Sequence, residues 1–136
     1  MSKQLTVEAE TDKLDEVLEF VGGILEEAEC SMKAKIQLDV AVEEIFVNIA
    51  NYAYGDSKGM AEIMVEIEDS PKAAVIEFRD TGMQFDPLAK PDPDTTLSAD
   101  QRQIGGLGIF MVKKSMDDVS YRYEDGRNIF TMRKLI

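Results

Sequence analysis

Between about residues 12 and 54, hydrophobic residues recur at the three- and four-residue spacing of a helix. Residues 5–7 alternate apolar with polar side chains, and this alternation predicts a short initial strand. Apolar positions three and four apart then predict an amphipathic helix over about 12–29, with Thr11 as its N-cap. A second amphipathic helix is predicted to follow its cap Ser31 and to stop before Gly55.

The second half of the chain changes to alternating spacing. Residues 60–79 are predicted to form two strands joined by a proline turn, and 119–123 with 129–134 a second hairpin around a tight turn at 125–126. A helix over 109–116 precedes that hairpin. This order of elements indicates an α+β fold, a two-layer α/β sandwich with a mostly antiparallel mixed sheet and helices on one face. It does not fit a repeated βαβ unit.

The composition of the chain excludes several classes of function. The 136 residues suit a single domain, 1–136. With 15 basic and 27 acidic residues the net charge is −12, which argues against binding nucleic acid or an anionic membrane surface. The lack of histidine excludes Ser-His-Asp catalysis and most zinc sites. The single cysteine, with no apolar leader and no membrane-length run, leads us to expect a cytoplasmic protein.

Three short motifs offer chemistry, and the first lies on the second predicted helix. Glu44 and Asn48 are one turn apart and share a face, whereas Glu43 points about 100° away from Glu44. A carboxylate can accept a proton from a hydroxyl group, and an amide oxygen can ligate Mg²⁺. The same pair would also suit an exposed helix face without a task.

The second motif ends the predicted strand that finishes at residue 79. Continued alternation points Asp80 inward, where a lone carboxylate needs a partner. Such a carboxylate can accept a hydrogen bond from an exocyclic amine, and Gly82 would let a flat ring approach the backbone. The alternative is that Asp80-Thr81-Gly82 forms an ordinary turn.

The third motif, Gly105-Gly106-Leu107-Gly108, opens the helix that follows a long polar segment, 86–104. Free backbone N–H groups and the helix dipole favour phosphate at such a position. The motif is neither a Walker A loop nor a dinucleotide fingerprint, and it could instead be a flexible joint. A loop as long as 86–104 in a compact domain is usually functional or disordered.

In this order the three motifs resemble those of the GHKL (Bergerat-fold) ATPase superfamily, which includes gyrase, the MutL repair protein and histidine kinases. Residues 44–48 match its N box, 80–87 its first glycine box and 105–112 its second. The segment 116–119 and the length of the chain are most similar to those of the bacterial anti-sigma-factor serine/threonine-protein kinases.

The resemblance implies ATP and Mg²⁺ as cofactors. It implies Glu44 as the general base on an incoming serine hydroxyl, Asn48 as the Mg²⁺ ligand, and 86–104 as an ATP lid. Arg102 in that lid would either neutralise phosphate charge or be solvated. Asp80 would bind the adenine amino group. The implied cofactor-binding set is Asn48, Asp80, Gly82, Gly105, Gly106, Leu107, Gly108 and Thr131.

The resemblance also implies partners. The substrate would be a serine on a STAS-domain anti-anti-sigma protein, and the ATP-bound kinase, a homodimer, would otherwise hold a sigma factor. An alternative is an ATP-binding module that sequesters a partner without phosphorylating it. The catalytic fragment of a histidine kinase is disfavoured, because the chain has no histidine.

Overall fold

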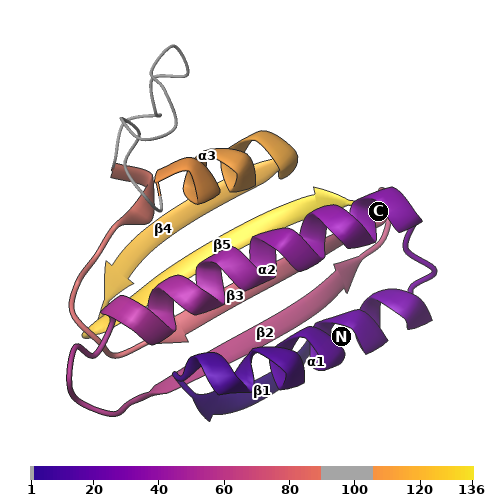
Figure 1. The fold of residues 1–136 in the computed structure, drawn as a ribbon. Coiled ribbons are helices and arrows are strands. Elements are labelled where there is room, and N and C mark those ends of the chain that lie inside the picture. The colour runs from indigo at the N-terminus through magenta and orange to yellow at the C-terminus, as the bar shows by residue number, and fades with distance from the viewer. Residues whose placement is uncertain (1, 90–105) are drawn as a thin grey trace.

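Three helices lie over one face of a five-stranded sheet in the computed structural model, which describes residues 2–89 and 106–136 (Figure 1). The strands are β1 Ser2–Glu8, β2 Met60–Glu68, β3 Ala73–Asp80, β4 Asp118–Glu124 and β5 Arg127–Leu135. The helices are α1 Leu14–Glu27, α2 Met32–Tyr52 and α3 Gly106–Ser115, with short 3₁₀ turns at Thr11–Lys13 and Pro87–Ala89. The predicted order of elements is therefore confirmed.

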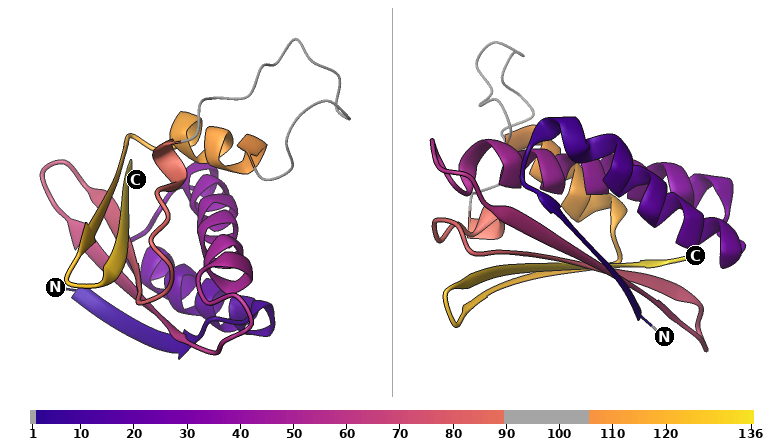
Figure 2. Two further views of the ribbon diagram at one scale, coloured as in Figure 1. Left: turned by 90° about the vertical axis from the view of Figure 1, so that its left-hand side faces the viewer. Right: turned by 90° about the horizontal axis from the view of Figure 1, so that it is seen from below.

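The strands lie in the spatial order β1-β2-β3-β5-β4, so the last strand sits between β3 and the edge strand β4. Each of the four neighbouring pairs is antiparallel. The predicted α+β sandwich is confirmed, and its sheet among the described residues is antiparallel throughout rather than mixed. Figure 2 shows the helices of the described residues together on one side of the sheet, with none of them on the other side.

The core forms where the helices meet the inner face of the sheet. Alternate residues of β3, Ala74, Ile76 and Phe78, are buried there against α2 residues such as Leu38 and Phe46. The same alternation brings Asp80, which is 6% exposed, into the buried layer at the end of β3. The inward direction predicted for this carboxylate is confirmed.

The two long helices begin differently. The Ser31 hydroxyl oxygen accepts a hydrogen bond from the Ala34 amide at 3.2 Å, so the predicted cap of α2 is confirmed. Thr11 does not cap α1, and that prediction is wrong. A 3₁₀ turn intervenes, Lys13 occupies the N-cap position of α1, and no side chain supplies a capping hydrogen bond there.

Length and hydropathy also bear on membranes. In the parts of the chain that the structure describes, no helix combines the length and apolar character needed to cross a bilayer.

Replacing the α2 cap tests this account of the fold. Ser31→Ala removes the acceptor for the Ala34 amide, so the free energy of unfolding should fall by about 1 kcal/mol. Urea unfolding of the variant and of Ser120→Ala, an exposed serine on β4, measures the difference. Equal losses in the two variants would contradict the cap.

A buried carboxylate beside the start of a helix

The centre of the candidate site is the Asp80 carboxylate, placed by the pairing of β3 with β5. In that register Asp80 lies directly opposite Asn128, which is 7% exposed. The Asp80 Oδ1 atom accepts hydrogen bonds from the Gly82 amide and from Asn128 Nδ2, both at 2.9 Å. None of the ion pairs between described residues involves Asp80. Two neutral donors therefore hold this buried charge.

Asn128 is a site residue that the motifs did not reveal. Its side chain bridges β5, the end of β3 and the turn after it, and it also touches β4 through Tyr121. The sequence signal for Asn128 is the alternation along the last strand, which places it on the same inward face as Phe130 and Met132. Using that signal requires knowing that β5 pairs with β3, which no local pattern shows.

A mostly apolar pocket opens beside Asp80. α2 contributes one wall, the turn after β3 another, and α3, β4 and β5 complete it. Apart from Asp80, Asn48 and Asn128, its lining is aliphatic or aromatic. The lining residues are Ile45, Asn48, Ile49, Tyr52, Ala53, Phe78, Asp80, Met83, Phe85, Pro87, Ile109, Tyr121, Asn128 and Phe130. Such a pocket, apolar with a few polar groups, suits a flat ring that carries a hydrogen-bond donor.

The α2 motif reaches the edge of the same pocket. Asn48 Nδ2 donates to the Glu44 carbonyl oxygen at 2.8 Å and to Glu44 Oε1 at 2.9 Å. Both partners are acceptors, so they fix which end of the amide is nitrogen. Within the described residues the Asn48 Oδ1 atom has no hydrogen bond, and this hard oxygen fits the first coordination shell of Mg²⁺. Glu43 is exposed on another face, as predicted.

The first turn of α3 lies against the Glu44 carboxylate. A Cβ atom added at Gly108 would overlap both carboxylate oxygens of Glu44, so a larger residue there would displace the end of the Glu44 side chain. Gly106 and Leu107 form the first residues of α3. The structure thus brings Glu44, Asn48 and the second glycine motif together. Gly105, Arg102 and most of the predicted lid 86–104 lie outside the described residues.

Gly82 also has a packing role that the sequence did not predict. A Cβ atom at Gly82 would overlap the Ala53 carbonyl group and Cβ, so the turn packs tightly against the end of α2. The neighbouring Met83 amide donates to the Ala53 carbonyl oxygen at 2.7 Å. Gly82 therefore allows the turn after β3 to pack closely against the end of α2, beside the pocket.

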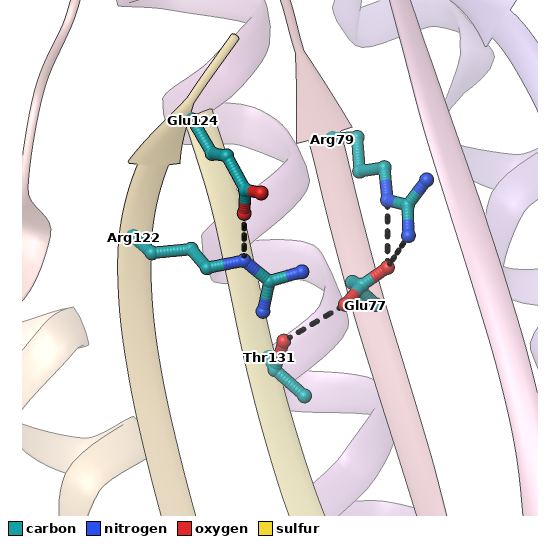
Figure 3. A network of polar contacts seen from close by, with 5 residues as sticks. All are labelled: Glu77, Arg79, Arg122, Glu124 and Thr131. Carbon is teal, nitrogen blue, oxygen red and sulfur yellow. Dashed lines mark hydrogen bonds and ion pairs between the residues drawn. The ribbon is translucent and has the colours of Figure 1, made fainter. Parts of the chain in front are cut away.

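Thr131 does not join the other predicted residues. It alternates with the buried Phe130 and Met132, so its side chain lies on the outer face of the sheet. There its hydroxyl donates to Glu77 Oε1 at 3.2 Å, and Glu77 also pairs with Arg79 at 2.6 Å (Figure 3). The strand itself separates Thr131 from the pocket beside Asp80. The position that faces Asp80 is three residues earlier, at Asn128.

Burial changes the acidity of the site. Desolvation raises the pKa of Asp80 above its ordinary value, and the hydrogen bonds from Asn128 and Gly82 oppose that rise. Desolvation likewise raises the pKa of Tyr121, which lines the same pocket. The ionised Asp80 carboxylate therefore costs stability at neutral pH, and its retention in a pocket points to a functional role.

This cost predicts an unusual effect of mutation. A carboxyl group whose pKa is raised on folding stabilises the protein less as pH rises through the window above its ordinary pKa. Asp80→Asn removes the charge and keeps an acceptor for Gly82, so it should raise the free energy of unfolding at pH 7 and have a smaller effect at pH 5. Urea unfolding at both pH values measures this, with the exposed Asp69→Asn as control. A lower stability at pH 7 would contradict the assigned cost.

Comparisons with known proteins agree with this geometry. The sequence profile of the histidine kinase-like ATPase domain matches residues 7–134. Serine-protein kinase RsbW of Listeria monocytogenes serovar 1/2a is 31% identical over 114 residues, which cover 80% of this chain and 71% of the relative. RsbW of Listeria innocua serovar 6a is 30% identical over 114 residues, which again cover 80% of this chain and 71% of the relative. Serine/threonine-protein kinase BtrW of Bordetella bronchiseptica is 26% identical over 102 residues, 75% of this chain and 71% of the relative.

The family match over residues 7–134 covers the strands and helices that form the pocket as well as the motifs themselves. The chain therefore belongs to the histidine kinase-like ATPase family, as its resemblance to the GHKL superfamily and its anti-sigma-factor serine kinases implied.

Proposed function

We propose that the chain is an ATP- and Mg²⁺-dependent protein serine kinase and anti-sigma factor. Its substrate would be a serine of a STAS-domain anti-anti-sigma protein in a partner-switching system. The observation that carries the proposal is the buried Asp80 acceptor in an apolar pocket that is also lined by Asn48, the hydrogen-bond partner of Glu44. The names of the relatives, serine-protein kinase and serine/threonine-protein kinase, support the same activity.

In this proposal the pocket binds the adenine ring. Asp80 accepts a hydrogen bond from the adenine amino group while aromatic and aliphatic side chains contact the ring. The backbone N–H groups of Gly106 and Gly108, at the start of α3, would face the phosphates, where the helix dipole favours negative charge. Asn48 would ligate Mg²⁺ through its free oxygen.

Glu44 supplies the acid–base chemistry. Its carboxylate would take the proton from the serine hydroxyl as the serine oxygen bonds to the γ-phosphorus and the bond from that phosphorus to the bridging oxygen breaks, releasing ADP. The carboxylate lies beside Gly108 in the first turn of α3, close to where the phosphates would bind. In the described structure the Asn48 amide orients it.

The proposed partners follow from the family. We propose that the ATP-bound chain, as a homodimer, holds a sigma factor and releases it when the STAS-domain partner binds. The net charge of −12 suits association with a basic partner surface. The alternative, an ATP-binding module that sequesters a partner without phosphorylating it, would not need Glu44 as a base.

Nucleotide binding is tested first. Asp80→Ala should weaken ATP binding by about 10- to 150-fold, because it removes a charge-assisted hydrogen bond worth roughly 1.5–3 kcal/mol. Calorimetric titration with ATP, with and without Mg²⁺, measures the dissociation constant. Asp69→Ala, in the exposed turn at the opposite end of β3, is the matched control. An unchanged dissociation constant in Asp80→Ala would exclude the adenine assignment.

Phosphoryl transfer is tested separately. Glu44→Gln should slow phosphorylation of a serine-bearing STAS-domain partner by about 10²–10⁴-fold, since it removes the general base. Its neighbour Glu43→Gln, exposed on another face of α2, should have little effect. Transfer of labelled phosphate under single-turnover conditions measures the rate, and calorimetry checks that both variants bind ATP. Wild-type rates in Glu44→Gln would favour the sequestering module.

A further inference from the structure

Asn128 uses every hydrogen-bonding group of its side chain within the protein. Its Nδ2 atom donates to Asp80 Oδ1 and to the Met83 carbonyl oxygen, both at 2.9 Å. Its Oδ1 atom accepts from the Phe85 amide at 3.1 Å and from the Tyr121 hydroxyl. A primary amide has two N–H donors and one carbonyl acceptor with two lone pairs. Nothing is left for a ligand, so Asn128 acts through the groups that it holds.

These contacts also fix which way the amide faces. Two donors, from Phe85 and Tyr121, converge on Oδ1, and two acceptors, from Asp80 and Met83, converge on Nδ2. Turning the amide over would place its oxygen against two acceptors, the Asp80 carboxylate and the Met83 carbonyl oxygen, and an N–H group against the Phe85 amide. The network therefore favours one arrangement, because the reversed one breaks these three hydrogen bonds.

One consequence concerns the two oxygens of Asp80. Oδ1 already accepts from Asn128 and Gly82, whereas Oδ2 has no hydrogen bond within the described residues. Asp80 lines the pocket, so the oxygen that remains available to a ligand is a pure acceptor while the carboxylate is ionised. An amino group on a purine satisfies it, but a carbonyl oxygen at the same ring position meets like partial charge.

A second consequence concerns the pocket wall. Met83 and Phe85, which Asn128 holds through their backbones, both line the pocket. Asn128 therefore holds both the acceptor, Asp80, and the part of the pocket wall, Met83 and Phe85, against which a ring would stack.

We propose that Asn128 is a positioning residue that makes the pocket select a 6-aminopurine over a 6-oxopurine by holding Asp80 with one oxygen occupied and the other open. This inference rests on the proposed nucleotide site. Without Asn128 the carboxylate loses one of its two donors, and a protonated Asp80 could then donate to the oxo group that the wild-type site rejects.

The pH dependence follows from the groups around Asp80. Its pKa is raised by burial and lowered by the Asn128 hydrogen bond, so losing that bond raises it further. The titratable groups lining the same pocket are Tyr52 from α2 and Tyr121 from β4, and Asp86, from the segment after β3, acts on Tyr121. Among the described residues, those that line the pocket from α3 and β5 include no titratable group. Asp80 also borders a second hollow, which is lined by Glu62, Arg79 and Arg127. The causes of the Asp80 pKa shift are burial and the hydrogen bonds from Asn128 and Gly82, not these charges.

The experiment compares ATP and GTP binding by wild type and by Asn128→Ala between pH 5.5 and 8.5. Wild type should prefer ATP at every pH. In Asn128→Ala the preference should fall about tenfold or more, and should fall further as pH decreases and Asp80 is protonated. Tyr121→Phe, which removes one donor to Asn128, should show a smaller loss in the same direction and remains informative if Asn128→Ala does not fold.

A control separates selection from general loosening of the strand. Met132→Ala creates a cavity in the core of β5, on the same face as Asn128, so it should lower stability while leaving the preference for ATP unchanged. Equal loss of preference in Met132→Ala, or an unchanged preference in both Asn128→Ala and Tyr121→Phe, would overturn the proposal.

A second readout needs no nucleotide. Carbon-13 NMR titration of the Asp80 carboxyl group should give a higher pKa in Asn128→Ala than in wild type. If wild type binds neither nucleotide, the proposed function fails, and this titration still decides whether Asn128 holds the carboxylate. An unchanged Asp80 pKa would overturn the inference even if ATP binds.

Discussion

A carboxylate that has lost its water remains ionised inside a protein only where hydrogen bonds replace the lost solvation. Asp80 is such a group, and its two donors come from different parts of the fold. Gly82 belongs to the turn after β3, and that turn is pressed against the end of α2. Asn128 comes from β5 and is aligned by the sheet register. The position of this one charge therefore depends on the β3–β5 pairing and on the seating of α2.

α2 links this carboxylate to the rest of the site. Its last turn supports Gly82, its middle contributes Asn48 to the pocket, and Glu44, one turn earlier, meets the beginning of α3. A straight helix therefore sets the spacing between the proposed base-binding end and the proposed reacting end. Relative positions along one helix vary little, which suits the alignment of a nucleotide with a protein substrate that we propose for this site.

Sequence predicted the features that depend on local periodicity. Alternation along β3 placed Asp80 inward, and helical spacing placed Glu44 with Asn48 and apart from Glu43. Alternation along β5 also places Thr131 on the opposite face from Phe130 and Met132. The assignment of Thr131 came instead from family resemblance, which identifies a strand more reliably than the residue on it that faces the site. Asn128 could not be found locally, because its role arises from pairing between strands 48 residues apart. The 3₁₀ turn before α1 was not predicted, because the preference of threonine for N-cap positions does not show at which residue a helix begins.

The place of β5 has a consequence for how the protein matures. This strand follows all the other described elements in sequence, yet it lies inside the sheet between β3 and β4. During synthesis the earlier strands and helices emerge first, and Asp80 has no cross-strand partner until the β4–β5 hairpin pairs with β3. Completion of the hydrophobic core and completion of the carboxylate's surroundings are then a single late event. A nascent or truncated chain that lacks β5 would therefore lack both together.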